Sequence, residues 1–149
     1  MPNDSRLPRV LHVLLHLDGI DKPVTSELIG KMLNTNPSLV RRTMGGLRNA
    51  GLLNSTKGHH GGWSLAKPLE KISLADVYAA LGAPNLFSVG QSEDAPQCLL
   101  EKAANVAIAS ALTHAHESFL HELQHTTVAE LVNASRDAIS LHQESISKA

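Results

Sequence analysis

The segment from Thr25 to Leu65 is the part of the sequence that constrains the fold most. It predicts two helices, over Thr25–Leu33 and Pro37–Ala50, and leaves only a tight turn between them. Thr25 and Asn36 are good N-caps for these helices, and a proline suits the first helical position. Two strand-like pieces around a glycine-rich tip follow, which predicts a β-hairpin. Two helices joined by a short turn and followed by a hairpin are typical of a winged helix-turn-helix.

The rest of the chain is expected to be helical. Helices are predicted over Leu7–Leu17, over Ile72–Leu81 and from Gln97 to Gln124, and a last one begins at Thr126 or Thr127. Aromatic residues make up only 3% of the sequence, which favours helices over a β-sandwich. The expected fold class is mainly α with a small β-hairpin. We expect a winged helix-turn-helix domain in residues 1–82, a linker loop in 83–96, and dimerisation helices with a tail in 97–149.

Charge is divided unevenly along the chain. Up to Lys71 there are ten lysines and arginines against five acids, and after Lys71 there are three against nine. The first part therefore carries a net charge of +5 and the second a net charge of −6, which agrees with the total of −1. A basic first half predicts a module that binds a polyanion such as double-stranded DNA.

The helix that begins at Pro37 has two different faces. Val40, Met44 and Leu47 form an apolar inner stripe. Its other face predicts DNA contacts. Arginines there can bind guanine edges, and Ser38 or Asn49 can bind bases or phosphates. The alternative is that this face is only solvated. The wing tip is predicted to touch phosphate or the minor groove, and Trp63 to pack at the wing base. The predicted DNA-binding residues are Ser38, Arg41, Arg42, Arg48, Asn49, Lys57, His59 and His60.

The helix from Gln97 carries an apolar stripe over its whole length. At the standard rise it is ~40 Å long, which is more than a small domain can cover. A second copy of the same helix is the natural partner, so a homodimer is expected. The stripe consists of Leu100, Ala104, Ala107, Ile108, Ala111, Ala115, Phe119 and Leu123.

An ordered series of segments resembles a known family. The segments are Pro37–Arg42, Leu47–Leu53, Gly58–Leu65 and Ile72–Val77, and together they are similar to the Rrf2 family of winged-helix repressors, typified by IscR and NsrR. The resemblance runs from the first helix to the Thr126–Leu131 segment. It implies a homodimer whose long helices cross and whose two heads bind a pseudo-palindromic operator, with repression as the expected mode.

The chain departs from the family members that carry an iron–sulfur cluster. Those members have two or three cysteines before the long helix, whereas this chain has only Cys98. One thiolate per chain is a poor cluster anchor, even with His12 on the first helix, where some relatives place another ligand. The resemblance is closer to a single-cysteine branch, and we expect no cofactor.

Two further features leave alternatives open. Cys98 is either a redox or electrophile sensor, favoured by its position near a helix N-terminus, or a small buried hydrophobe. His114, Glu117, His121 and His125 share one helix face, which predicts either a metal or small-ligand site or simply a polar surface.

The sequence favours a DNA-binding transcription regulator over an enzyme. It contains no phosphate loop and no nucleophile elbow. No apolar run reaches the length of a membrane span, and Met1–Arg6 does not resemble a signal peptide, so a cytoplasmic protein is expected. Two functions remain as alternatives. One is a dimeric regulator that binds a metal or small ligand on the His114, Glu117 and His121 face, and the other is a winged-helix module that contacts proteins rather than DNA.

Overall fold

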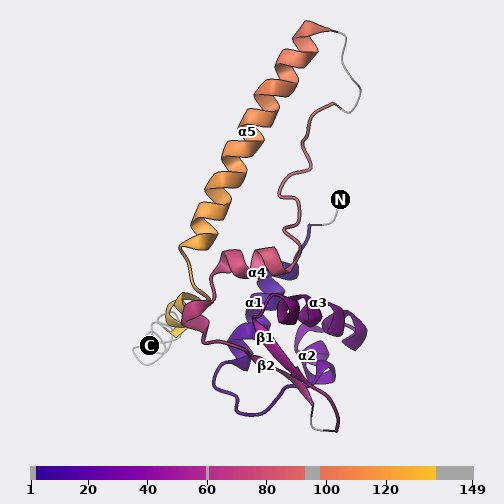
Figure 1. The fold of residues 1–149 in the computed structure, drawn as a ribbon, viewed down its shortest axis with the longest axis vertical. Coiled ribbons are helices and arrows are strands. Elements are labelled where there is room, and N and C mark those ends of the chain that lie inside the picture. Colours follow the sequence, from indigo (N-terminus) through magenta and orange to yellow (C-terminus); the bar gives the residue numbers. More distant parts are fainter. Residues whose placement is uncertain (1–2, 60, 93–97, 137–149) are drawn as a thin grey trace, which may run out of the picture.

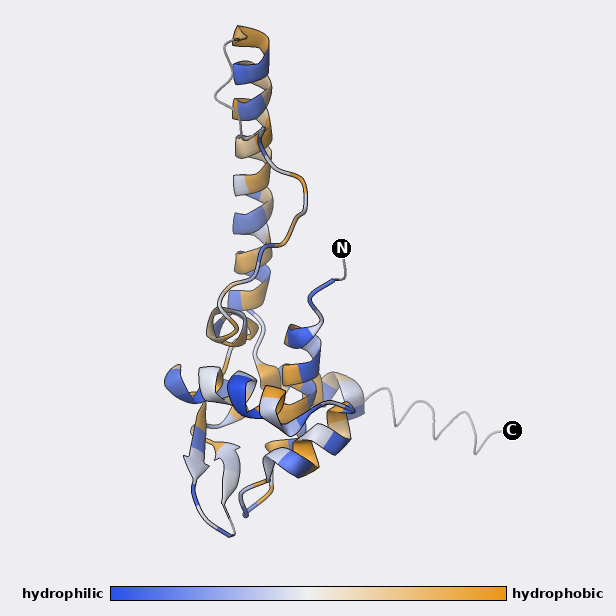
Figure 2. Ribbon diagram, turned by 90° about the vertical axis from the view of Figure 1, so that its right-hand side faces the viewer, coloured by the Kyte–Doolittle hydropathy of each residue, from blue (hydrophilic) through white to orange (hydrophobic). Residues whose placement is uncertain are grey.

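The computed structural model describes residues 3–59, 61–92 and 98–136, and it shows a compact head from which one long helix projects (Figure 1). The chain leaves the head after α4, runs beside the long helix α5 as an irregular strap (residues 83–92), and returns to the head along α5 (Figures 1 and 2). In chain order the elements are α1 (Arg6–Leu17), α2 (Ser26–Leu33), α3 (Pro37–Asn49), β1 (Leu53–Thr56), β2 (Gly62–Leu65), the 3-10 turn η1 (Leu69–Lys71), α4 (Leu74–Ala80) and α5 (Leu99–Gln124).

Side-chain caps fix where the helices begin. The Thr25 hydroxyl accepts a hydrogen bond from the Leu28 amide at 3.2 Å, and the Asn36 side chain accepts one from the Ser38 amide at 2.7 Å. Ser73 and Asp76 form a reciprocal capping box at the start of α4. Such caps satisfy amides that have no partner within the helix. The predicted fold class, mainly α with one small hairpin, is confirmed.

The wing is a two-stranded antiparallel hairpin that is tied to the head. Leu53 pairs with Leu65 and Thr56 with Gly62. A further bridge joins Trp63 to Val24, in the connection between α1 and α2, with N–O distances of 2.8 and 2.9 Å. At Gly62 a Cβ atom would lie 2.4 Å from the Val24 carbonyl oxygen, so only glycine permits this close approach.

A single hydrophobic core lies inside the head. It receives side chains from α1, α2, α3, both strands, η1 and α4, so every element of the head contributes. The largest side chains with less than 2% exposure are Leu14, Ile29, Met44, Leu47, Leu52, Leu53, Leu69 and Ile72.

The chain beyond α5 closes the head. The Leu74 amide donates to the Thr126 carbonyl and the Val128 amide donates to the Ile72 carbonyl, both at 2.9 Å. Val128 is 0% exposed and belongs to the core of the head. Residues 128–136 are helical, which agrees with the helix predicted to begin at Thr126 or Thr127. The core of the head therefore includes a residue that lies far beyond position 82.

The long helix α5 is almost uncovered. None of its 26 residues is buried. Phe119 packs edge-on against Tyr78 of α4 with ring centroids 5.4 Å apart, and the Asn105 side chain donates to Ser92 of the strap at 3.0 Å. In the described part of the chain, no helix is both long and apolar enough to cross a membrane.

Candidate nucleic-acid interface

A tight turn sets the angle between α2 and α3. Asn34 adopts the left-handed conformation at the end of α2, and the Thr35 amide donates to the Gly30 carbonyl at 2.8 Å. A Cβ atom at Gly30 would lie 2.8 Å from the Thr35 carbonyl oxygen, so a side chain there would push the turn away from α2. The turn therefore places α3 across the face of the head, as in a helix-turn-helix.

The outer face of α3 is exposed and carries the predicted contact residues. Val40, Met44 and Leu47 are buried, which turns the opposite side of the helix to solvent. Ser38, Arg41, Arg42, Arg48 and Asn49 are all exposed. The structure thus brings the predicted α3 residues together on one surface beside the wing.

The three arginines of α3 differ in what they contact. The Arg41 guanidinium pairs with the Glu27 carboxylate of α2 at 2.9 Å. The Arg48 guanidinium donates to the Ser55 hydroxyl of β1 at 3.2 Å and lies 5.8 Å from the centre of the Trp63 ring. Among the residues that the structure describes, Arg42 has no side-chain hydrogen bond or ion pair. It is therefore the arginine most available to a ligand.

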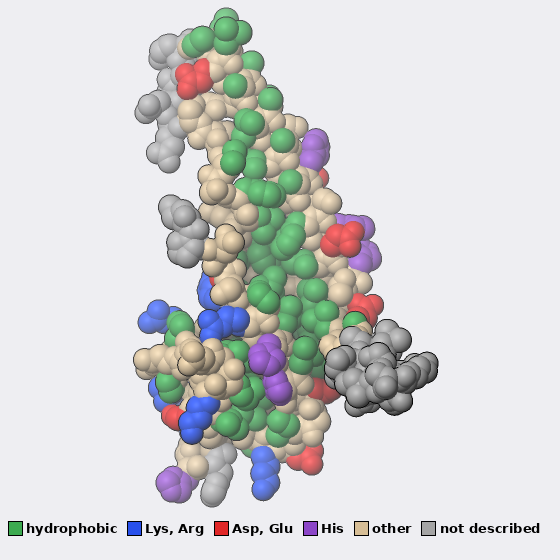
Figure 3. Space-filling view, turned by 180° about the vertical axis from the view of Figure 1, so that it is seen from behind, with side chains coloured by type: hydrophobic (Ala, Val, Ile, Leu, Met, Phe, Trp, Pro, Cys, Tyr) green, Lys and Arg blue, Asp and Glu red, His purple; other side chains and the backbone are tan. Residues whose placement is uncertain are grey.

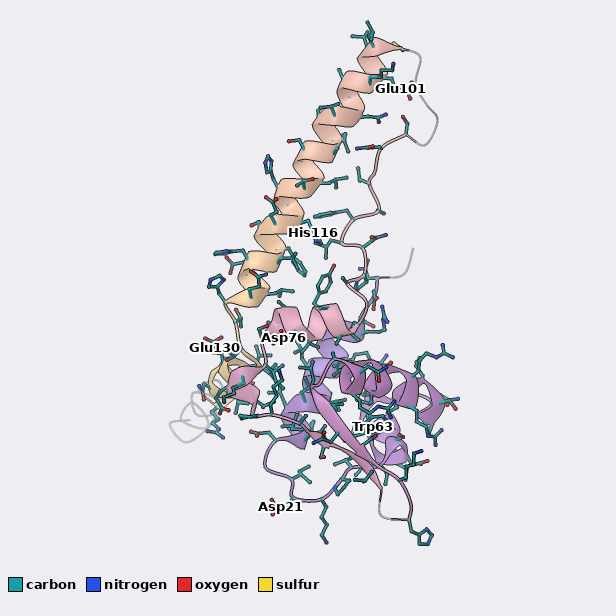
Figure 4. The ribbon with its side chains drawn as sticks, in the orientation of Figure 1. Asp21, Trp63, Asp76, Glu101, His116 and Glu130 are labelled. Atoms are coloured by element: carbon teal, nitrogen blue, oxygen red, sulfur yellow. The ribbon has the colours of Figure 1, made fainter. Side chains whose placement is uncertain are left out.

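Trp63 anchors the wing to the head. It is 7% exposed, and its indole Nε1 donates to the Ser26 hydroxyl at 2.9 Å. Figure 4 places Trp63 where the hairpin meets the helices. The predicted role of Trp63 as a packing residue at the wing base is consistent with this burial. The hydrogen bond from Trp63 to Ser26 does not follow from the sequence analysis. The only hint of it in the sequence is that a small polar residue occupies the first position of α2.

The wing tip presents basic and imidazole side chains. Lys57 and His59 are exposed at the tip, and His60 lies outside the described residues. Gly58 has a φ of +103° and a Cβ atom at Gly61 would lie 2.3 Å from the Thr56 carbonyl oxygen, so the tight turn depends on glycine.

Cys98 lies at the far end of α5, as its N-cap, and is exposed. Of the two alternatives for Cys98, burial is therefore not what the single chain shows. The backbone amides of Glu101 and then Leu100 lower the pKa of the Cys98 thiol below its usual value, because they stabilise the thiolate.

The predicted histidine face does not form a metal centre. His121 and His125 stack with ring centroids 4.2 Å apart, and the His125 Nδ1 atom lies 2.7 Å from the His121 carbonyl oxygen. In residues 3–59, 61–92 and 98–136, no three side chains of His, Cys, Asp or Glu are arranged to hold a metal ion. Helical spacing alone does not preform a site, and in the single chain His114, Glu117, His121 and His125 do not form a ready ligand set.

Comparison with known proteins agrees with this architecture. A family model described as "Rrf2: Iron-dependent Transcriptional regulator" matches residues 3–134. A Bacillus subtilis protein named "Putative HTH-type transcriptional regulator YwnA" is 32% identical over 131 residues, which cover 87% of this chain and 96% of that protein. The chain belongs to the Rrf2 family of transcriptional regulators.

Solved structures show the same fold. IscR of T. potens superimposes with a TM-score of 0.65 at 18% identity, covering 93% of this chain and 90% of that one. CymR of B. subtilis, titled the global cysteine regulator, superimposes with a TM-score of 0.60 at 20% identity, covering 90% of this chain and 98% of that one. These two structures resemble the present one in fold.

The residues of this chain do not fit an iron–sulfur cluster of the usual kind. Such clusters are held by about four ligands, mostly cysteine thiolates. This chain has one cysteine, and the part that the structure describes holds no cluster of metal-binding side chains around it. Cys98 alone therefore cannot supply the ligands that an iron–sulfur cluster needs, although the family model is described as iron-dependent.

Proposed function

We propose that this regulator is a homodimer that binds a pseudo-palindromic site in double-stranded DNA and represses transcription there. The observation that carries the proposal is the exposed cationic face of α3 beside the basic wing. Arg42 is the candidate for a bidentate contact to guanine, while Ser38 and Asn49 lie on the same face for bases or phosphates. Lys57 and His59 at the wing tip, together with His60, are the candidates for contacts to the backbone or the minor groove.

The long helix supports the dimer. Figure 3 shows a band of hydrophobic side chains along α5 that continues onto the head. Within the predicted stripe, Ala104, Ala107 and Ala111 are exposed and Ile108 is 38% exposed, while Leu100 is 81% exposed. Exposed apolar surface of this extent on one helix favours association with a second copy. In this proposal residues 1–82 form most of the DNA-binding head, 83–96 the linker and 97–149 the dimerisation part, although Val128 packs in the head.

The experiment that tests DNA binding is a capture of fragmented genomic DNA by the purified protein, followed by sequencing. We expect enrichment of a two-fold symmetric sequence whose half-sites are about one helical turn, ~34 Å, apart or a multiple of it. Affinity for that sequence should fall steeply with salt, because cations on the protein displace counterions from phosphates. Uniform recovery of fragments without a shared sequence would refute the operator, and a lack of retention at low salt would leave a protein-contacting module instead.

A redox response through Cys98 is the second part of the proposal. The thiol is exposed and its lowered pKa favours the thiolate, which is the form that peroxides and electrophiles attack. The sulfur attacks one peroxide oxygen, the O–O bond breaks, and the leaving hydroxide takes up a proton to give water. The sulfur is oxidised to a sulfenic acid and the peroxide is reduced. The added polar group lies at the start of the dimer helix, where it can alter the spacing of the two heads.

Titration of operator DNA after peroxide treatment tests this response, with Cys98→Ser as the matched control. We expect the wild-type protein to lose affinity and the serine variant to keep it. If the two proteins respond alike, Cys98 has no role in sensing.

A further inference from the structure

A concavity separates the wing from the helix-turn-helix. It has a volume of about 450 Å³ and lies between the N-terminus of α2, the wing-side flank of α3 and the glycines of the hairpin. Arg41, Arg48 and Lys57 contribute three cationic side chains to its lining. Among the described lining residues, Glu27 is the one carboxylate. The basic charge of the head accounts for the three cations, but it does not account for the acid placed among them.

The geometry of DNA suggests what this hollow receives. If α3 enters a major groove and the wing enters the adjacent minor groove, the strand that separates the two grooves must pass between α3 and the wing. The concavity is the space between them. The DNA backbone carries one negative charge per nucleotide. Arg41, Arg48 and Lys57 therefore attract it, and Glu27 repels it. This step rests on the DNA-binding function proposed above.

The two arginines of the hollow are held differently. Arg48 is directed to the wing, where it contacts the Ser55 hydroxyl and the face of Trp63. Arg41 is directed to the opposite wall, where its Nη2 atom lies 2.9 Å from Oε1 of Glu27. Both side chains of this pair are more than half exposed, at 53% and 60%. An exposed pair is weakly held, so Arg41 can change its partner at little cost when a stronger anion is placed correctly.

We propose that Glu27 is a specificity-determining residue, because it withholds Arg41 from the DNA backbone until a phosphodiester segment enters the concavity. On a non-cognate sequence α3 does not seat fully in the groove, so the phosphates stay at the mouth of the concavity, where they do not displace Glu27 from Arg41. On the operator the contacts of Arg42 and the wing draw the strand into the hollow, and Arg41 exchanges the carboxylate for a phosphate. Glu27 thus weakens binding to all other sequences more than binding to the operator.

The test compares operator DNA with a scrambled duplex of the same length over a range of salt concentrations. The variants are Glu27→Gln, Arg41→Met and the double variant, with Glu101→Gln as a charge-matched control at the far end of α5 (Figure 4). For Glu27→Gln we expect tighter binding to the scrambled duplex, by about two- to fivefold per head. We also expect its log–log salt dependence to steepen by about 0.9 for each head, because Arg41 now neutralises a phosphate there. The ratio of the two affinities should fall, and Glu101→Gln should behave as wild type.

The double variant decides whether Glu27 acts through Arg41. In the Arg41→Met background, Glu27→Gln should leave the salt dependence on scrambled DNA unchanged. An equal gain in both backgrounds would mean that Glu27 only repels phosphate, and a loss confined to the operator would mean that it contacts a base. Either result overturns the proposal. Failure of the wild-type protein to bind any DNA would instead refute the proposed function itself.

Discussion

The head and the long helix of this protein differ in where their apolar side chains find partners. Every element of the head sends a side chain into one core, whereas α5 buries none of its 26 residues. The head therefore obtains its stability from contacts within one chain, and α5 displays an apolar stripe that the chain itself leaves open (Figure 3). The difference implies that substitutions in the two regions should respond differently to protein concentration.

The largest loss of stability is expected in the head. Leu47 is 0% exposed on the inner face of α3, so Leu47→Ala leaves a cavity and should lower the free energy of unfolding by about 2–5 kcal/mol. Urea denaturation measures this. The loss should be the same at low and high protein concentration, and a loss that disappears at high concentration would contradict the separation of the two regions.

In the long helix, a charge placed on the stripe should prevent association. Ile108→Asp puts a carboxylate in the proposed dimer contact and should weaken dimerisation by about 3 kcal/mol or more. Light scattering should give the dimer mass for the wild-type protein and the monomer mass for the variant. Ser110→Asp, on the other side of α5, should remain a dimer. If Ile108→Asp is still a dimer, the stripe is not the contact.

Within the head, α3 and the wing should contribute to DNA binding in different ways. Arg42→Ala should cost about 1–3 kcal/mol per half-site and relax the preference at one base pair. Lys57→Ala should weaken binding to all sequences alike and lower the salt slope by about one unit. Anisotropy titrations with single-base operator variants separate the two. Unchanged binding by both variants would mean that the face of α3 is misassigned.

The hydrogen bond between wing and head should contribute less to stability than the core residue Leu47 does. Ser26→Ala leaves the buried Trp63 Nε1 donor without its partner, which should cost about 1–3 kcal/mol of stability. Thermal unfolding measures this cost, with the exposed Ser38→Ala as a control. Equal melting temperatures for Ser26→Ala and wild type would show that the Trp63 hydrogen bond is dispensable.

The smallest expected effect is on reactivity rather than on stability. Because the pKa of Cys98 is lowered, its thiolate fraction at neutral pH exceeds that of an ordinary cysteine. The alkylation rate should therefore reach its plateau at a lower pH than the rate of a cysteine in an unstructured peptide. Stopped-flow alkylation from pH 6 to pH 10 checks this, and a profile that matches the peptide would contradict the lowered pKa.

The sequence predicts local structure well where caps and periodicity act within a few residues. The turn at Asn34, the cap at Asn36 and the capping box at Ser73 follow from short-range chemistry, and the structure has all three. Contacts between segments distant in sequence leave no such pattern. The pairs Ser26–Trp63 and Glu27–Arg41 form only because the helices and the wing come together in space.

The same limit explains why the sequence left two alternatives open. A helical spacing of three and four places His114 and His121 on one face, but their rotamers and distances are not encoded in that spacing. Burial of Cys98 was one of two alternatives, based on the usual fate of free cysteines, yet the end of α5 extends beyond the reach of the head. Only the arrangement of α5 in space could show that exposure.

The hydrogen bonds between residues 72–74 and 126–128 have a consequence for how the protein is made. The strap and α5 lie between these two segments in the sequence. The chain from residue 75 to residue 125, called here the arm, is therefore a long loop whose ends are joined within the head. Closing a loop of this length costs entropy and places Val128 in its core position late in folding. During translation the head cannot complete its core until the ribosome has synthesised the whole arm. Each finished head therefore already carries α5, the proposed dimerisation helix, and a prematurely terminated chain would not release a stable single head that competes for half-sites.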